Sequence, residues 1–402
     1  MNKYTEKKQV EIFLLSSIVR YVIYLTIIAL INSVAVIFSR SISLLANALF
    51  LAYVFTLSFL VAYAMEKILE GSVEYRTFIT LSLVTSLIFL CWTIILLVIV
   101  ILNIPYSEFL PNPHIAIVAA LVSFLFFAVV GLKLEDLLKE HNRWIAIFFG
   151  DFSNLLMISS LFPIAGTLLN LLAVLWMEPA MAIVILLILL RETISDTIRA
   201  YRVKFGKWRK EPIEKKLKDI CEMFPVVRGV DEISLHQFVR FIVGDIKLCV
   251  SPLVEEKDFE NLRYIVLRKS LYEIPGLLTV RIAIEKLEED IIPVGIPLAN
   301  ENKVGTLNGT KKILIAEISY PSGEITRKEV IDVKGFEKYT INPIRPIVAM
   351  LTRKVIGIIA KNAEEIAANA ARGWLMKLMI TDKDTVEKAL EDFIKVIVRK
   401  EH

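Results

Sequence analysis

A carboxylate lies inside a long apolar stretch of this sequence, where ionisable side chains are rare. The range 144–190 carries two charged residues, Asp151 and Glu178. A charged side chain at the centre of a bilayer costs about 2.5 kcal/mol or more, so Asp151 is expected to face a polar interior and to bind an ion, a proton or a partner. Asn47 and Asn154 carry amides that could share this interior. The alternative is structural: Asp151 is hydrogen-bonded to Asn or Ser, and the two amides join neighbouring helices.

Six apolar stretches in the first half of the chain would position these side chains. A helix rises 1.5 Å per residue, so about 20 apolar residues cross a hydrocarbon layer of about 30 Å. Trp176 to Pro179 is typical of an interfacial turn that divides the range 144–190 into two spans. Four further spans are ranges without a charged residue: 21–39, 41–65, 77–107 and 109–132. The sequence therefore predicts a bundle of six transmembrane helices in residues 1–210.

Lysine and arginine are concentrated in alternate connections of this bundle. The N-terminus, the second and fourth connections and the segment after the last span are basic, whereas the third and fifth connections contain no Lys or Arg. By the positive-inside rule, both termini of this multi-pass cell-membrane protein are cytoplasmic. Hydrophobic residues make up 55% of the chain and the mean hydropathy is +0.60, values that favour the lipid bilayer as a partner. The basic connections account for the net charge of +4, so no nucleic-acid partner is expected.

After Lys210 the pattern changes to short strands and amphipathic helices. The spacing predicts helices over 212–224 and 255–271, and strands over 234–243, 247–251 and 277–285. Gly244-Asp245 is the expected hairpin turn between the first two strands. This α-β-β-α-β order is typical of a small open-faced sandwich over 211–289. In 290–402 strands and helices alternate, which indicates a partly parallel sheet covered by helices.

Sequence motifs of the common enzyme classes are absent. The chain has no GxSxG, GxGxxG, HExxH or phosphate-binding loop, and Cys91, Cys221 and Cys249 form no CxxC pair. We therefore expect no catalytic activity, no zinc ribbon and no disulfide framework. No cofactor is evident from the residues.

Several segments resemble the cation diffusion facilitator family. Residues 41–50 (SISLLANALF), 149–154 (FGDFSN) and 189–196 (LLRETISD) are similar to the family's second, fifth and sixth transmembrane helices. Residues 227–232 (VRGVDE) and 274–277 (IPGL) are similar to its cytoplasmic domain. The resemblance implies a homodimeric secondary transporter with a ferredoxin-like α+β cytoplasmic domain. Such a protein exports a divalent metal cation, its substrate, in exchange for protons.

Most of the family's membrane ligands are replaced in this chain. The resemblance implies four ligands in the second and fifth helices, where this chain has Phe50, Val54, Ile147 and Asp151. Hydrocarbon side chains offer no lone pair to a metal, so an intact zinc site of the usual kind cannot form. The remaining carboxylate and the two amides would suit a hard divalent cation or a proton. The lost ligands leave an alternative open, a transport-inactive membrane-anchored scaffold or regulatory paralogue with cytoplasmic interaction domains.

The resemblance also implies ligands for a regulatory metal in the cytoplasmic domain. Asp231, Cys249 and Glu285 lie where relatives carry His and acidic ligands. A thiolate and carboxylates can bind a divalent metal together. The alternative for Cys249 is a small buried hydrophobic residue within a strand.

The end of the chain is similar to the dinitrogenase iron-molybdenum cofactor biosynthesis family. The similar segments are 294–303 (VGIPLANENK), 323–325 (GEI) and 385–390 (TVEKAL). The resemblance implies an RNase H-like α/β domain over 290–402. Such a domain can bind a metal, a metal cluster or a partner, and we expect an accessory module here. Of the family's His-Phe-Gly-Arg loop, residues 307–310 (LNGT) keep the glycine alone, which argues against cofactor binding.

Overall fold

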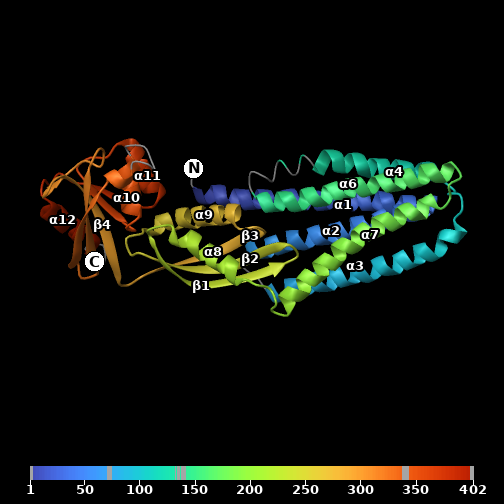
Figure 1. Ribbon diagram of the computed structural model, residues 1–402, viewed down its shortest axis with the longest axis horizontal. Coiled ribbons are helices and arrows are strands. Elements are labelled where there is room, and N and C mark those ends of the chain that lie inside the picture. The colour runs from blue at the N-terminus through green and yellow to red at the C-terminus, as the bar shows by residue number, and fades with distance from the viewer. Residues whose placement is uncertain are drawn as a thin grey trace. The chain divides into compact units, whose positions relative to one another are not determined.

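A computed structural model describes residues 3–69, 75–131, 133, 136, 142–336 and 344–398 of the chain (Figure 1). The chain forms two compact units. The helical unit comprises Met1–Lys210 together with two short segments, Leu235–Val243 and Leu271–Thr279. The second unit comprises the rest of the chain after Lys210.

The helical unit consists of long apolar helices. They are α1 (Lys3–Ser39), α2 (Ile42–Leu69), α3 (Tyr75–Asn103), α4 (Pro113–Phe126, continued by a π-helical turn Phe127–Gly131), α6 (Arg143–Leu171) and α7 (Met177–Lys204). Within the described residues, α1, α2, α3, α4 and α6 are long and apolar enough to cross a bilayer. The prediction of a multi-pass membrane protein is thus confirmed. The more charged α7 is the sixth long helix, and its crossing of the bilayer stays a prediction.

The predicted interfacial turn at 176–179 is wrong over its last three residues. Helix α6 ends at Leu171 and α7 already begins at Met177, with Trp176 at its N-cap. Glu178 lies buried in the first turn of α7, where its carboxylate accepts a set of hydrogen bonds instead of facing water at an interface. Its Oε1 accepts from the Ser41 hydroxyl (2.7 Å) and from the Ser43 backbone N–H (2.7 Å) and hydroxyl (2.8 Å), so this carboxylate caps the first turn of α2.

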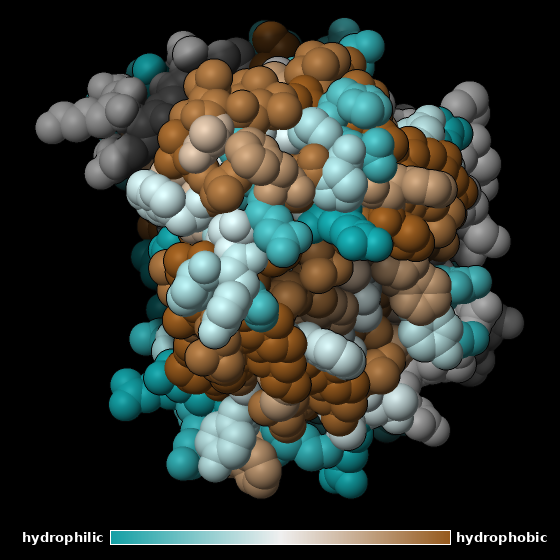
Figure 2. All heavy atoms as spheres, turned by 90° about the vertical axis from the view of Figure 1, so that its right-hand side faces the viewer, coloured by the Kyte–Doolittle hydropathy of each residue, from teal (hydrophilic) through white to brown (hydrophobic). Residues whose placement is uncertain are grey.

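Aromatic rings fill the core between the helices. Tyr21, Phe50, Tyr53, Phe149 and Phe152 are all fully buried there. The Tyr21 and Phe149 rings meet edge to face at 5.0 Å, a geometry that adds to the hydrophobic contribution. The outer surface is apolar as well. Many large hydrophobic side chains are exposed along the length of α1 and α3, as expected of a surface in contact with lipid rather than water. Figure 2 shows the end of the helical unit at which α6 leads into α7, where hydrophobic and hydrophilic side chains are mixed.

After Lys210 the chain forms a three-stranded sheet of order β1-β2-β3, of which Leu235–Val243 and the first residues of β3 are counted with the helical unit. Its elements are α8 (Glu211–Glu222), β1 (Val227–Phe238), β2 (Phe241–Val250), α9 (Glu256–Glu273) and β3 (Leu277–Lys286), which is the predicted α-β-β-α-β order. The predicted Gly244-Asp245 turn is wrong, because Gly244 lies inside β2 and the chain reverses at Val239-Arg240. Val239 adopts a φ of 52° there, a left-handed conformation unusual for a β-branched residue.

The last part of the chain forms a mixed sheet of order β7-β6-β4-β8-β9, with β5 paired to β4. The strands are β4 (Asp290–Asn300), β5 (Lys303–Val304), β6 (Lys312–Tyr320), β7 (Ile325–Asp332), β8 (Gly357–Ala360) and β9 (Lys377–Ile380). The helices are α10 (Arg345–Leu351), α11 (Glu365–Gly373) and α12 (Val386–Val398). The β4–β8 and β8–β9 pairs are parallel, whereas the β4–β6 and β6–β7 pairs are antiparallel. The predicted partly parallel sheet is confirmed.

Candidate functional site

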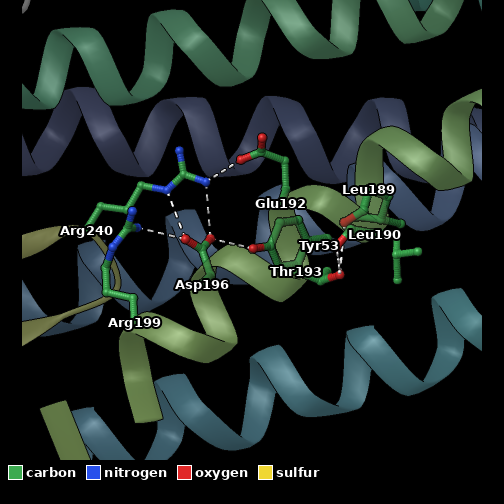
Figure 3. Close-up of polar contacts among 8 residues, drawn as sticks. All are labelled: Tyr53, Leu189, Leu190, Glu192, Thr193, Asp196, Arg199 and Arg240. Carbon is green, nitrogen blue, oxygen red and sulfur yellow. Dashed lines mark hydrogen bonds and ion pairs between the residues drawn. The ribbon is translucent and has the colours of Figure 1, made fainter. Parts of the chain in front are cut away.

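The most buried charged cluster of the helical unit is centred on Asp196 of α7 (Figure 3). The side chain of Asp196 is 1% exposed and accepts hydrogen bonds from three residues. The Tyr53 hydroxyl of α2 lies 2.5 Å from Oδ2, and Arg199 Nη1 lies 2.9 Å from Oδ1. Arg240 Nε donates to Oδ1 at 3.1 Å. A buried carboxylate is stable only when its oxygens are satisfied, and here the donors come from α2, from α7 and from the β1–β2 turn.

The Arg240 guanidinium joins two carboxylates. Its Nη2 lies 2.5 Å from Glu192 Oε2 and 3.3 Å from Asp196 Oδ2, and its Cζ lies 4.7 Å from the centre of the Phe152 ring. Burial alone would lower the pKa of this guanidinium. Asp196 and then Glu192 more than offset that effect, so the Arg240 pKa is raised and its charge is firmly held. The planar guanidinium stacks on the Phe152 ring and holds its donors in a fixed geometry, whereas a lysine ammonium is a compact charge on a flexible side chain.

Local sequence explains why these groups meet. Glu192 and Asp196 are four residues apart on α7 and so project from one face of the helix. The turn that carries Arg240 is held by rings on either side: Phe238 lies 6.0 Å from Phe78, and Phe241 lies 4.9 Å from Phe148. The cluster therefore attaches a β-hairpin tip to α3, α6 and α7 through charge and aromatic packing. Thr193, between the two acids, donates to Leu189 and Leu190 carbonyls of its own helix.

Sequence reasoning missed this cluster as a site. In the sequence, residues 189–196 (LLRETISD) carry only the family resemblance, and no pattern singles out Arg240. Two acids spaced i, i+4 near the end of an apolar helix were a usable signal, because ionisable residues are rare in such helices. Nothing local identified the partner, since Arg240 lies 44 positions beyond Asp196.

The three residues expected in the membrane site differ in burial. Asn47 is fully buried, where its Oδ1 accepts from the Ser159 hydroxyl at 2.8 Å and its Nδ2 lies 3.5 Å from the Ser160 hydroxyl. Asp151 and Asn154 are exposed side chains of α6. The structure thus shows Asn47 linking α2 to α6, and it does not enclose the three residues together. Their role in metal binding stays a prediction.

The positions where the resemblance implies further ligands are filled with hydrocarbon. Phe50 and Val54 have no exposed surface and belong to the core, and Ile147 is half-buried. Tyr53, on the same helix, lies edge to face with Phe152 at 6.3 Å. Beside Phe50 and Val54 the core is thus built of apolar and aromatic side chains.

The residues expected in the cytoplasmic site do lie near one another, but a lysine stands among them. Lys247 Nζ lies 2.7 Å from Glu285 Oε2 and 3.1 Å from Asp231 Oδ2. Hydrogen bonds to Glu285 and then Asp231 raise the Lys247 pKa. Burial, Asp231 and Glu285 raise the Cys249 thiol pKa, and Lys247 opposes them. No group of three metal-binding side chains suited to an ion occurs within the described residues, and Lys247 supplies the positive charge between these two carboxylates.

The loop at 307–310 is fastened to its own domain. Asn308 Oδ1 accepts from the backbone N–H of Glu364, the N-cap of α11, at 3.2 Å, and Leu307 is fully buried. Gly309 adopts a φ of +67°, which explains why a glycine is kept there. The Asn308 side chain is thus hydrogen-bonded to a backbone N–H group at the start of α11.

Comparisons with known proteins give partial structural similarities. No family model and no curated protein matches the chain. Among solved structures, a variant of the MamM CTD is similar over 20% of this chain and all of its own, at 18% identity and a TM-score of 0.19. A copper form of another MamM CTD variant gives 17% identity, with the same two coverages and the same TM-score. A protein from Methanocaldococcus jannaschii described as a dinitrogenase is similar over 27% of this chain and 92% of its own, at 21% identity and a TM-score of 0.21.

Proposed function

We propose that this chain is a secondary membrane transporter of the cation diffusion facilitator type, which exports a divalent cation from the cytoplasm in exchange for protons. The observation that carries the proposal is the buried cluster of Asp196, Glu192 and Arg240. Charged groups are costly in a membrane helix, and a simple anchor has no need of them. Here they connect α7 and α2 to a hairpin tip, an arrangement suited to a bundle whose movements are coupled to its soluble part.

The proposed topology has six spans with both termini in the cytoplasm. Helix α7 supports the sixth span, since its 28 residues exceed the length needed to cross about 30 Å of hydrocarbon. Its residues 179–190 are uncharged, and its last turn carries Arg202 and Lys204. An even number of spans returns the chain to its starting side, in agreement with the basic connections. We propose a homodimer as the assembly.

The proposed substrate is a hard divalent cation, with protons as the exchanged ion. The expected donors are the carboxylate of Asp151 and the amides of Asn47 and Asn154, which offer oxygen ligands. Such oxygens suit magnesium or manganese better than zinc, which favours nitrogen and sulfur. A metal bound there is substrate rather than a resident cofactor.

A second function, a transport-inactive scaffold or regulator, is favoured by one observation. Phe50 and Val54 are fully buried in hydrocarbon and aromatic packing, with no oxygen or nitrogen of their own to offer an ion. In this case the helices anchor the soluble domains, and the polar contacts between helices are structural. Flux measurements separate the two functions.

The test uses the full chain in proteoliposomes that contain a manganese-sensitive dye and a pH-sensitive dye. The proposal expects Mn²⁺ entry with proton movement in the opposite direction, strongly reduced by Asp151→Asn. Glu66→Gln, an exposed acid of α2, is the matched control and should leave the flux unchanged. Absence of ion and proton flux in a correctly folded dimer would refute the transporter and favour the scaffold.

A further inference from the structure

The chain that follows the acidic cluster is strongly cationic. Residues 197–210 contain six Lys or Arg and no Asp or Glu. One of the six, Arg199, bonds Asp196, whereas the other five lie exposed: Arg202, Lys204, Lys207, Arg209 and Lys210. The simplest account of such a run is a solvated face, and that account leaves the neighbouring aromatic residues unexplained.

Large aromatic side chains are exposed among these cations. Tyr201 is 46% exposed and Phe205 is 58% exposed, and their ring centres lie 4.5 Å apart. Lys207 Nζ lies 5.8 Å from the centre of the Tyr201 ring, and Trp208 is half-buried. Exposed rings are unfavourable in water, whereas aromatic side chains are enriched at the headgroup level of a bilayer.

A second helix contributes to the same surface. Lys204 Nζ donates to the Thr80 hydroxyl of α3 at 2.5 Å, so the end of α7 lies beside the beginning of α3. Arg76, at the beginning of α3, is exposed too. The opposite end of α7 has no such charge, because residues 144–190 contain no Lys or Arg. The positive charge is thus gathered at one end of two apolar helices, where a membrane surface would meet them.

We infer that residues 201–210 together with Arg76 form a binding surface for anionic phospholipids. The phosphates of the headgroups accept hydrogen bonds from the guanidinium and ammonium groups, and the Tyr201 and Phe205 rings lie at the level of the ester groups. The occupant is lipid rather than a soluble phosphate, because exposed rings accompany the cations and the surface continues an apolar helix. The surface lies one turn beyond Arg199, so bound lipid also holds the end of α7 that carries Asp196.

The test compares lipid selection by the full-length protein and two triple variants. Each protein is equilibrated in vesicles of three parts phosphatidylcholine to one part phosphatidylglycerol, extracted mildly, and its retained lipids are measured by mass spectrometry. Arg202→Gln, Lys207→Gln and Arg209→Gln together remove three cations of the surface. The matched control, Lys311→Gln, Lys328→Gln and Lys334→Gln, removes three exposed cations from the last domain.

The wild type and the control should retain phosphatidylglycerol above its share in the vesicle, and the first triple variant should not. Each cation contributes roughly fivefold at low salt and less as salt screens the surface. Phe205→Ser should weaken retention without changing charge, whereas added glycerol phosphate should not displace the lipid. Equal retention by both triple variants, or equal loss in both, would refute a specific surface. Displacement by glycerol phosphate would show a soluble anion site and equally refute the lipid.

Discussion

Two clusters of this molecule share a composition and differ in depth. In the helical unit Asp196 and Glu192 are joined by Arg240, and in the second unit Asp231 and Glu285 are joined by Lys247. The first set is 1%, 13% and 24% exposed, whereas the second set is 54%, 57% and 39% exposed. The same pair of carboxylates around one cation is therefore a fixed attachment in one place and a weak surface contact in the other.

Burial explains why the two clusters use different cations. A buried cation must satisfy both carboxylates in a fixed geometry, and the planar guanidinium of Arg240 does this while it stacks on Phe152. A solvated ammonium such as that of Lys247 keeps its water and its rotational freedom. Removing one member of a buried set leaves a charge unpaired in low dielectric, but surface pairs commonly contribute little.

The largest expected effect follows from Arg240→Gln. Loss of this guanidinium leaves Glu192 without its partner and Asp196 with only Tyr53 and Arg199, so we expect a loss of about 3 kcal/mol of stability. The measurement is the thermal unfolding midpoint of the full chain in detergent, followed by tryptophan fluorescence. Arg281→Gln is the matched control, since it breaks an exposed pair with Asp245. Equal midpoints for the two variants would remove the distinction between the clusters.

A smaller effect is expected from Tyr53→Phe. This change removes one hydrogen bond to a buried carboxylate, which contributes about 1.5 kcal/mol, while both arginines stay in place. The same unfolding measurement applies. Tyr24→Phe alters an exposed tyrosine of α1 and should leave the midpoint unchanged. A midpoint for Tyr53→Phe that matches the control would mean that the hydroxyl does not help to hold Asp196.

The smallest effect on stability is expected from Lys247→Met, which should leave the unfolding midpoint unchanged. Its effect lies in the thiol chemistry of Cys249, because Lys247 lowers a pKa that burial, Asp231 and Glu285 raise. Without the lysine that pKa rises further, the thiolate fraction at pH 8 falls, and alkylation by iodoacetamide slows.

The alkylation assay must report on Cys249 alone, and two further variants test the cause of the change in its rate. In a Cys91→Ala background Cys221 stays unreactive, because burial and then Glu222 raise its thiol pKa to about 12. Asp231→Asn should speed Cys249 alkylation, and Lys257→Met, whose ammonium contacts Glu255, should not change it. Faster alkylation after Lys247→Met would contradict the electrostatic account of this cluster.

Sequence reasoning was sufficient for the apolar helices and for the order of strands, and it was insufficient for the turns and faces that build the clusters. Gly244-Asp245 has the residues of a hairpin turn, yet the turn lies at Val239-Arg240. Packing of Phe238 and Phe241 and the ion pairs of Arg240 outweigh local turn preference. These interactions are long-range, so no local pattern reveals them.

The candidate membrane residues show the same limit. Helix α6 is apolar on nearly all sides, so its sequence does not tell which side chains face the core. Asn47 is enclosed by serines of α6, whereas Asp151 is exposed on that helix. The i, i+4 spacing of Glu192 and Asp196 is visible in the sequence of α7, whereas their arginine partner, Arg240, is identified only by the fold.

The hairpin tip determines how the chain can be divided for study. Because Leu235–Val243 and Leu271–Thr279 belong to the helical unit, the boundary between the units is not a single point in the sequence. A fragment that ends at Lys210 lacks Arg240, Phe238 and Phe241, and it uncovers the rings of Phe78 and Phe148. A fragment that begins at Glu211 carries the same aromatic tip without its cover. We therefore expect both fragments to expose these rings to water, and insolubility of either fragment would say nothing against the stability of the whole chain.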